Sequence, residues 1–188
     1  MDDLIKRLKN GDEAAFNELV SQYSKKLYYL CLKMLQSESD AEDAVQNAFL
    51  KAYMNIAKFE EKSTVSTWLY RITVNVCMDI LRKKKKDNTA SLYNTDDDEN
   101  EYILDITDES ENVEKKVLEE ERKRELYKAI EKLKPKHKEL IILRDIEGLS
   151  YDEIAAILKM NVGTVKSGIN RARAYLLEKL KENKELFS

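Results

Sequence analysis

The sequence predicts an all-α protein of two small helical domains, a helical bundle and a helix-turn-helix unit, joined by a flexible acidic linker. Two observations lead to this fold class. The 188 residues include only 4 glycines and 1 proline, whereas alanine, leucine, lysine and glutamate are abundant, a composition typical of helical proteins. Apolar residues recur at intervals of three and four along both ends of the chain, which is the spacing of one helix face.

Charge divides the chain into three segments. Residues 1–86 carry 15 basic and 12 acidic side chains, residues 87–121 carry 2 and 14, and residues 122–188 carry 16 and 10. The net charges are therefore +3, −12 and +6, and the formal charge of −3 for the whole chain comes from the middle. We expect 87–121 to be a flexible acidic linker. The two flanking domains, 1–86 and 122–188, remain free to bind a nucleic acid.

The first domain is predicted to contain four helices. Gly11 and Asp12 separate the first two, and Ser39 or Asp40 is expected to cap the third. A polar stretch at 60–64 precedes the fourth. The expected helices cover about 4–8, 16–34, 41–53 and 66–84.

The second domain is predicted to end in a helix-turn-helix. One helix stops near Pro135, and the next ends at Gly148 as a left-handed cap. Ser150 and Glu153 then form a capping box at the start of a short helix. A four-residue break at 158–161 precedes a long final helix. A short capped helix, a tight turn and a longer helix are the arrangement of a helix-turn-helix.

The final helix presents a polar, basic face opposite its apolar stripe. Arginine and lysine can pair with guanine edges, asparagine with adenine, and threonine or serine with phosphates. An ordinary solvated helix surface is the alternative interpretation. The candidate DNA-reading residues are Thr164, Lys166, Ser167, Asn170, Arg171 and Arg173.

The helix at 66–84 carries a second candidate surface. Leu69, Ile72, Val76 and Ile80 are expected on its apolar side, and the opposite side holds Arg71, Asn75, Asp79 and Arg82. Trp68 stands at the edge and Lys83 to Lys86 follow. Cations suit phosphates, asparagine suits a base edge, and an aromatic ring can stack on an unpaired base. Alternatively, Trp68 belongs to the core and the lysines form a solvated helix end.

Several function classes find no support in the sequence. No signal peptide and no apolar run of about 20 residues is apparent, so we expect a cytoplasmic protein without direct membrane binding. Cys31 and Cys77 are interpreted as reduced core residues, His137 as a surface residue, and Asp96 to Glu99 as solvated linker. We find no metal or cofactor site, no phosphate-cradling glycine loop and no nucleophile set. We therefore expect neither an enzyme nor a small-molecule substrate.

Three stretches carry a resemblance to a known family. They read "SDAEDAVQNAFLKAYMNIAKF", "STWLYRITVNVCMDILRKKK" and "GLSYDEIAAILKMNVGTVKSGINRARAYL". The first two resemble region 2, and the last resembles region 4, of extracytoplasmic-function bacterial sigma factors of RNA polymerase. The resemblance implies an alternative sigma factor that binds core RNA polymerase, recognises the −10 and −35 elements of promoter DNA and assists DNA opening.

The resemblance also implies roles for individual residues. A core-polymerase surface would include Asp40, Glu42, Asp43 and Gln46. The −35 readers would be the six candidates of the final helix, with Arg173 nearer the backbone. A loop at 61–64 would help to hold a base flipped out of the stack. The −10 readers would be Glu61, Lys62, Ser63, Thr64, Trp68, Arg71, Asn75, Arg82 and Lys83.

Other implications concern the linker, regulation and promoter choice. The acidic linker would thread the polymerase where nascent RNA will run. Members of the family are usually held by an anti-sigma protein, often membrane-anchored. The family commonly has a basic residue where this chain has Gly168, and a larger side chain where it has Asn170, so we expect an altered −35 preference. The rival interpretation is a helix-turn-helix regulator that binds operators without polymerase.

Overall fold

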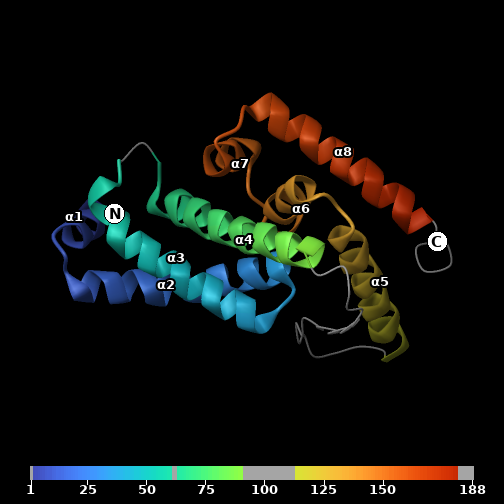
Figure 1. Ribbon diagram of the computed structural model, residues 1–188, viewed down its shortest axis with the longest axis horizontal. Helices are drawn as coiled ribbons and strands as arrows, with labels where there is room; N and C mark the ends of the chain where they lie inside the picture. Colours follow the sequence, from blue (N-terminus) through green and yellow to red (C-terminus); the bar gives the residue numbers. More distant parts are fainter. Residues whose placement is uncertain (1, 61–62, 91–112, 182–188) are drawn as a thin grey trace.

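The computed structural model describes residues 2–60, 63–90 and 113–181, and every regular element in these ranges is helical. The first domain contains α1 (Asp2–Lys9), α2 (Glu13–Leu35), α3 (Glu38–Asn55), the 3-10 turn η1 (Ile56–Lys58) and α4 (Val65–Ala90). The second contains α5 (Val113–Glu131), α6 (Pro135–Ile141), the π-helical turn η2 (Ile142–Ile146), α7 (Tyr151–Leu158) and α8 (Val162–Lys181). The all-α prediction is confirmed (Figure 1).

Local capping explains where the helices of the first domain begin. The Asp12 carboxylate accepts hydrogen bonds from the backbone N–H groups of Ala14 and Ala15, at 2.9 and 3.2 Å, and so starts α2. The cap of α3 is Ser37, whose hydroxyl accepts from the Asp40 N–H at 3.3 Å. The prediction of Ser39 or Asp40 as this cap is therefore wrong, because both lie inside the helix and Ser37 has the extended backbone that a cap requires.

The core of the first domain lies between α2, α3 and α4. Leu27, Leu30 and Leu69 are fully buried there, and so are both cysteines. The sulfur atoms of Cys31 and Cys77 lie 3.6 Å apart, and both thiols are free. The hydrogen bond with the Cys77 thiol, together with burial, raises the pKa of the Cys31 thiol far above its ordinary value, which keeps it protonated. The interpretation of both cysteines as reduced core residues is confirmed.

Turn chemistry shapes the second domain. Pro135 begins α6, where its missing N–H costs nothing, rather than simply ending α5. Gly148 has a φ of +72° and supplies the left-handed turn that was expected there. The capping box is present in full, because the Ser150 hydroxyl accepts from the Glu153 N–H and the Glu153 carboxylate accepts from the Ser150 N–H. Lys159, with a φ of 52°, ends α7 before α8 begins.

Gly168 is a packing residue of α8. It is buried, and a Cβ atom at this position would lie 2.6 Å from Cδ1 of Leu140 in α6. The glycine thus allows α8 to approach α6 closely, at the cost of roughly 1 kcal/mol in helix propensity relative to alanine. The sequence suggested a relinquished DNA contact at this position, whereas the structure gives the glycine a reason inside the domain.

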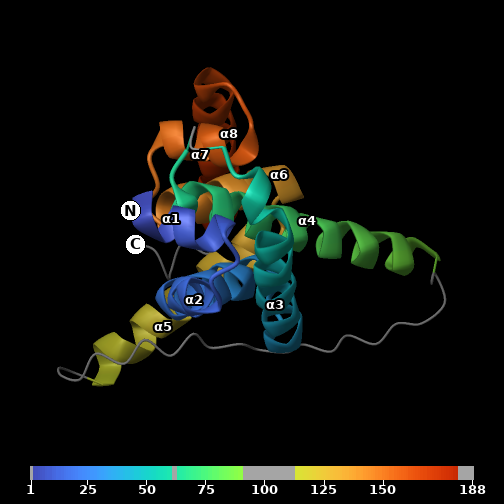
Figure 2. The same ribbon diagram turned by 90° about the vertical axis from the view of Figure 1, so that its left-hand side faces the viewer.

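The two domains pack against each other. Helix α7 lies beside α4, and α6 and η2 also contact the first domain (Figure 1). One cluster of buried apolar residues runs from the first domain into the second and includes Leu69, Leu143 and Ile154. Figure 2 shows the C-terminal turns of α4 projecting away from this body. Most of the predicted linker, 91–112, lies outside the described residues, while α4 and α5 occupy parts of its two ends.

Candidate nucleic-acid interface

A two-walled groove with a volume of about 610 Å³ runs along one side of the first domain. Its first wall comes from α4, where side chains three and four apart share one face. Its second wall comes from the end of α3 and from η1, which the sequence did not reveal. The first wall is Trp68, Ile72, Asn75, Asp79 and Arg82, and the second is Lys51, Asn55 and Lys58.

Trp68 lies where the core meets the groove, a position that fits either interpretation of its role. Its ring packs on Phe59, with centroids 5.2 Å apart and planes inclined by 53°. The side chain is half-buried and also lines the groove. Ile72 lies in the groove as well, although its spacing predicted the apolar side of α4. The contact with Phe59 fixes the ring, and the part of it that lines the groove is available for stacking on a base.

The remaining residues that line the groove are polar or charged. Asn75 and Arg82 are exposed, as predicted, and the Arg82 guanidinium forms an ion pair with Asp79 at 2.9 Å. Lys83 is exposed beyond the groove. Two cations on the second wall, Lys51 and Lys58, face this stripe across the hollow. The groove can therefore offer cations from both sides to a phosphate chain.

Arg71 is not in this groove. It is half-buried, and its Nε and Nη2 atoms both donate to the backbone carbonyl of Ala156 in α7, at 3.1 and 2.6 Å. Helical spacing places Arg71 close to Trp68 and Asn75 on α4, but its guanidinium turns towards α7 and does not line the groove. The structure thus separates Arg71 from the other candidate −10 residues of α4.

The described part of the loop before α4 begins at Ser63. Ser63 is half-buried and Thr64 is exposed. The Thr64 hydroxyl accepts from the Thr67 N–H at 3.1 Å and pairs with the Thr67 hydroxyl at 2.9 Å, which fixes the first turn of α4. Glu61 and Lys62, two other candidates for this loop, lie outside the described residues.

All six candidate residues of α8 are exposed on one side of the helix, and the buried stripe contains Val165, Ile169 and Ala172. Two cations are held by neighbours. The Lys166 ammonium lies 5.5 Å from the centre of the Tyr151 ring, and Arg173 forms an ion pair with Asp145. The candidates brought together are Thr164, Lys166, Ser167, Asn170, Arg171 and Arg173.

Hydrogen bonds and ion pairs fix the positions of Arg171 and Arg173 on α8, and both side chains stay exposed. The Nε atom of Arg171 donates to the Ser167 carbonyl at 3.1 Å and its Nη2 atom to the Ser167 hydroxyl at 3.5 Å, so the guanidinium lies along the helix. The hydrogen bond with Asp145 raises the pKa of Arg173 above its ordinary value, which keeps it cationic. The face as a whole suits a DNA groove.

The outer face of α3 combines acidic and apolar residues. Glu42, Asp43 and Gln46 are exposed, whereas Asp40 is half-buried and forms an ion pair with Lys84 of α4. Burial opposes ionisation of Asp40, but hydrogen bonds with Lys84 and Ser37 outweigh it and hold the pKa of the carboxyl below its ordinary value. The same face continues with three exposed apolar residues that the sequence analysis missed, Leu50, Tyr53 and Met54.

Leu50, Tyr53 and Met54 are 57%, 51% and 70% exposed. They follow Asp43 and Gln46 at helical intervals, so acidic and apolar groups form one strip along α3. Contiguous exposed apolar side chains beside polar ones are typical of protein–protein interfaces. The interval from Gln46 to Leu50 and Tyr53 was a usable signal in the sequence.

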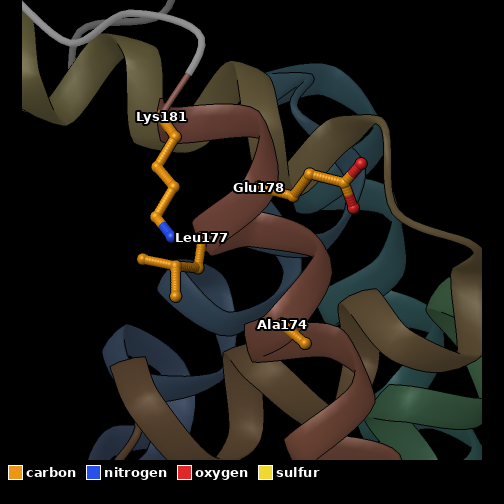
Figure 3. Close-up of a pocket in the computed structure, with 4 residues that line it drawn as sticks. All are labelled: Ala174, Leu177, Glu178 and Lys181. Carbon is orange, nitrogen blue, oxygen red and sulfur yellow. The ribbon is translucent and has the colours of Figure 1, made fainter.

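Other features of the described chain offer no competing site. The described residues that line a hollow of about 350 Å³ on the C-terminal half of α8 are Ala174, Leu177, Glu178 and Lys181 (Figure 3). Among the described residues there is no cluster of three or more histidine, cysteine or carboxylate side chains that could hold a metal ion. No helix in the described ranges is long and apolar enough to cross a membrane.

Comparisons with known proteins agree with this geometry. Residues 19–87 match the family model for sigma-70 region 2, and residues 123–176 match that for sigma-70 region 4. The chain is 38% identical over 178 residues to the ECF RNA polymerase sigma factor SigW of Bacillus subtilis, covering 95% of each chain. It is 39% identical over 170 residues to the ECF RNA polymerase sigma-E factor of Escherichia coli, covering 90% of this chain and 88% of that one.

Solved structures show the same fold. The structure of CnrH in complex with the cytosolic domain of CnrY matches with a TM-score of 0.67 and 26% identity, covering 95% of this chain and 96% of that one. The sigma factor RpoE in complex with the anti-sigma factor NepR from Bartonella quintana matches with a TM-score of 0.66 and 26% identity, covering 88% and 96%. With both sigma-70 regions matched in order and close relatives over nearly the full length, the chain belongs to the extracytoplasmic-function sigma factors of RNA polymerase.

Proposed function

We propose that this alternative sigma factor binds core RNA polymerase and divides promoter recognition between its two domains. The first would read the −10 element and assist DNA opening, and the second would read the −35 element. The observation that carries the proposal is the pairing, in one chain, of a two-walled polar groove on α4 with an exposed basic helix-turn-helix face on α8. The protein would act by binding alone, with no chemistry of its own.

The groove suits a single strand of DNA. Lys51, Lys58 and Arg82 would neutralise phosphates from two sides, Trp68 would stack on an unpaired base, and Asn75 would contact a base edge. The loop at 61–64 would receive a base flipped from the duplex, which lowers the cost of opening, a few kcal/mol for each unstacked base. Lys83, exposed beyond the groove, would contact the same strand's backbone.

Helix α8 suits the major groove of duplex DNA. Lys166, Asn170 and Arg171 would contact base edges, while Thr164, Ser167 and Arg173 would position the helix on the backbone. The capping box at Ser150 and the turn at Lys159 set the angle between α7 and α8. That angle lets one helix lie across the backbone while the other enters the groove.

The strip along α3 is proposed as the polymerase-binding surface. Glu42, Asp43 and Gln46 would meet basic and polar groups of the core enzyme, and Leu50, Tyr53 and Met54 would supply apolar contact. Asp40 contributes through its ion pair with Lys84, which ties α3 to α4. Docking at α3 and DNA binding at α4 would thereby be joined in one rigid domain.

An anti-sigma protein is the proposed regulatory partner. The solved relatives RpoE and CnrH were each captured in a complex, the first with the anti-sigma factor NepR and the second with the cytosolic domain of CnrY. Their likeness to this chain over most of its length supports a partner of the same class. The holoenzyme would act in the cytoplasm, at the nucleoid, because its substrate is promoter DNA.

Reconstituted transcription tests the proposal. The purified chain is mixed with sigma-free core polymerase and a library of promoter fragments, and transcript start sites are mapped with each component alone and with both. We expect start-site-specific transcripts only when both are present. Tight, sequence-specific DNA binding by the chain alone, without any effect on polymerase, would instead identify a stand-alone helix-turn-helix regulator.

A further inference from the structure

The ring of Phe59 brings together three elements of the first domain. Phe59 follows η1 directly and is only 4% exposed. Its ring packs on the Trp68 ring of α4, with centroids 5.2 Å apart. The Lys9 ammonium at the end of α1 lies 5.9 Å from the centre of the same phenyl ring, close enough for attraction between a cation and the electrons of the ring. Phe59 therefore links α1 to the tryptophan that lines the groove.

Phe59 also ties the two walls of the groove together. Lys58, the residue before it, is exposed on the second wall, whereas Trp68 belongs to the first. The Phe59 N–H donates to the Ile56 carbonyl at 3.0 Å, which fixes the backbone as the chain leaves η1. The contact between the two rings thus joins the segment that carries the second wall to the helix that carries the first.

The end of α1, where Lys9 meets Phe59, has a fixed position. Gly11 turns the chain after α1 with a φ of +77°. The Asp12 N–H donates to the Arg7 carbonyl at 3.1 Å, and the Asp12 carboxylate accepts from the Arg7 guanidinium at 2.7 Å. Helix α1 contacts both α2 and η1. The Lys9 side chain is therefore presented to Phe59 by a helix that is anchored on two sides.

The contact with Phe59 matters because Trp68 is only half-buried. A side chain in an open groove can adopt several rotamers, and fixing one of them when a base stacks on it costs entropy and lowers affinity. Packing on a buried ring restricts the indole during folding, so this entropy is already lost before DNA binds. Phe59 is too deeply buried to contact DNA itself. Any effect of Phe59 on binding must therefore act through its neighbours.

We propose that Phe59 is a positioning residue for single-stranded DNA. It fixes the indole of Trp68 for stacking on a base, and it is itself held by Lys9 of α1. The N-terminal helix thereby takes part in −10 binding without contacting DNA. This inference rests on the proposed stacking role of Trp68 and extends it to an element outside the groove.

Intrinsic fluorescence can follow this side chain alone, because Trp68 is the single tryptophan of the sequence. The full-length chain is titrated with a single-stranded oligonucleotide that carries the −10 sequence of a promoter active in reconstituted transcription. Stacking should quench the emission of the wild type. Phe59→Leu keeps an apolar side chain but removes the ring, so it should lower the affinity about fivefold and weaken the quenching at saturation.

Phe49→Leu is the matched control, because it removes a buried ring that packs on Phe16 instead of Trp68. It should bind and quench like the wild type. Circular dichroism verifies that each variant stays helical. Binding to a −35 duplex should be the same for Phe59→Leu and the wild type, since α8 belongs to the other domain.

Removing Trp68 separates positioning from stacking. Trp68→Ala should weaken oligonucleotide binding, and adding Phe59→Leu to it should cause no further loss, because Phe59 acts only through Trp68. Wild-type affinity of Trp68→Ala would contradict the stacking role and the positioning with it. If Trp68→Ala binds weakly but Phe59→Leu binds no worse than Phe49→Leu, the positioning is refuted and the stacking stands. Losses that add in the double variant would also refute the positioning.

Lys9→Met tests the part played by α1 at an exposed position, so it applies even where Phe59→Leu does not fold. Loss of the ammonium should lower the affinity about twofold and leave the slope of log affinity against log salt unchanged. Lys6→Met, at an exposed lysine of the same helix, is the control with the same change of charge. A slope that falls by about 0.7 would show that Lys9 binds a phosphate directly, and an unchanged affinity would show that α1 has no part in binding. Either result overturns the role of α1.

Discussion

Glu139 is a buried carboxyl group in α6 with an unusual titration. Burial raises its pKa from an ordinary 4.5 to about 7, and the nearby cations Lys136 and Arg82 only partly offset this. The native state therefore holds a proton at this site that the unfolded chain releases between these two pH values. Native stability contributed by the protonated form is complete below pH 4.5 and is lost as the pH rises through about 7.

We expect Glu139→Gln to remove this contribution of pH to the free energy of unfolding. The gap between the two pKa values corresponds to about 3 kcal/mol. Between pH 4.5 and pH 8, the free energy of unfolding of the variant should therefore come to exceed that of wild type by up to about this amount. Urea denaturation across this range measures it, with the exposed Glu131→Gln as control. A wild-type curve that runs parallel to that of Glu139→Gln would show that Glu139 ionises normally in the folded protein.

Two cationic side chains of α8, Lys166 and Arg171, are proposed to contact base edges. Lys166→Ala and Arg171→Ala should each lose about 1–3 kcal/mol on the cognate −35 sequence, because each removes a contact to a base edge. Binding to cognate and mutated −35 duplexes provides the measurement, and Lys181→Ala, at the far end of the same helix, is the control. Equal weakening on all sequences would mean that these side chains contact only phosphates.

For single residues, the spacing and the chemical type of the side chains predicted most of the candidate surfaces. They did not predict which residues these side chains contact elsewhere in the fold. The six residues of α8 are exposed together because one helix face follows from periodicity alone. Arg71 obeys the same periodicity, yet its guanidinium is engaged by Ala156, 85 residues along the chain. Gly168 looked like an altered DNA contact, and only the approach of Leu140 reveals its packing role. Such pairings depend on tertiary structure.

For the helices, residues that act on their sequence neighbours predicted where helices begin and end. They did not predict which helices form the two walls of the groove. Asp12, Ser150 and Gly148 act through neighbours within a few residues, so their effects can be seen in the sequence. The second wall of the groove arises because the end of α3 turns into η1 opposite α4. Lys51 and Lys58 are seven residues apart on that wall, and no local rule places them opposite Trp68.

The second wall predicts a salt effect. Lys51→Ala and Lys58→Ala should each weaken binding of a single-stranded −10 oligonucleotide, because each removes one phosphate contact. The slope of log affinity against log salt should fall by roughly 0.7 for each. Fluorescence titrations at several salt concentrations measure the slope, and Lys25→Ala on the exposed side of α2 is the control. An unchanged slope would remove the α3 wall from the DNA-binding surface.

For the whole molecule, charge segmentation and the order of the two signatures predicted two helical domains and an acidic connection. The packing of the domains could not be predicted, since Glu147 reads as an ordinary surface carboxylate in the sequence. Its ion pair with Lys33 joins positions 114 residues apart. One chain thus carries the groove along α4, the exposed polar face of α8 and the contacts that pack the two domains together.

Binding to core RNA polymerase is the most direct test of this account. Purified core enzyme is incubated with wild type, Asp43→Arg, or the control Glu13→Arg, an exposed acidic residue on α2, and complexes are separated by size-exclusion chromatography. We predict that wild type and Glu13→Arg co-elute with polymerase and that Asp43→Arg, still fully helical, does not. Normal co-elution of Asp43→Arg would contradict the α3 surface, and failure of the wild type to bind would contradict the account as a whole.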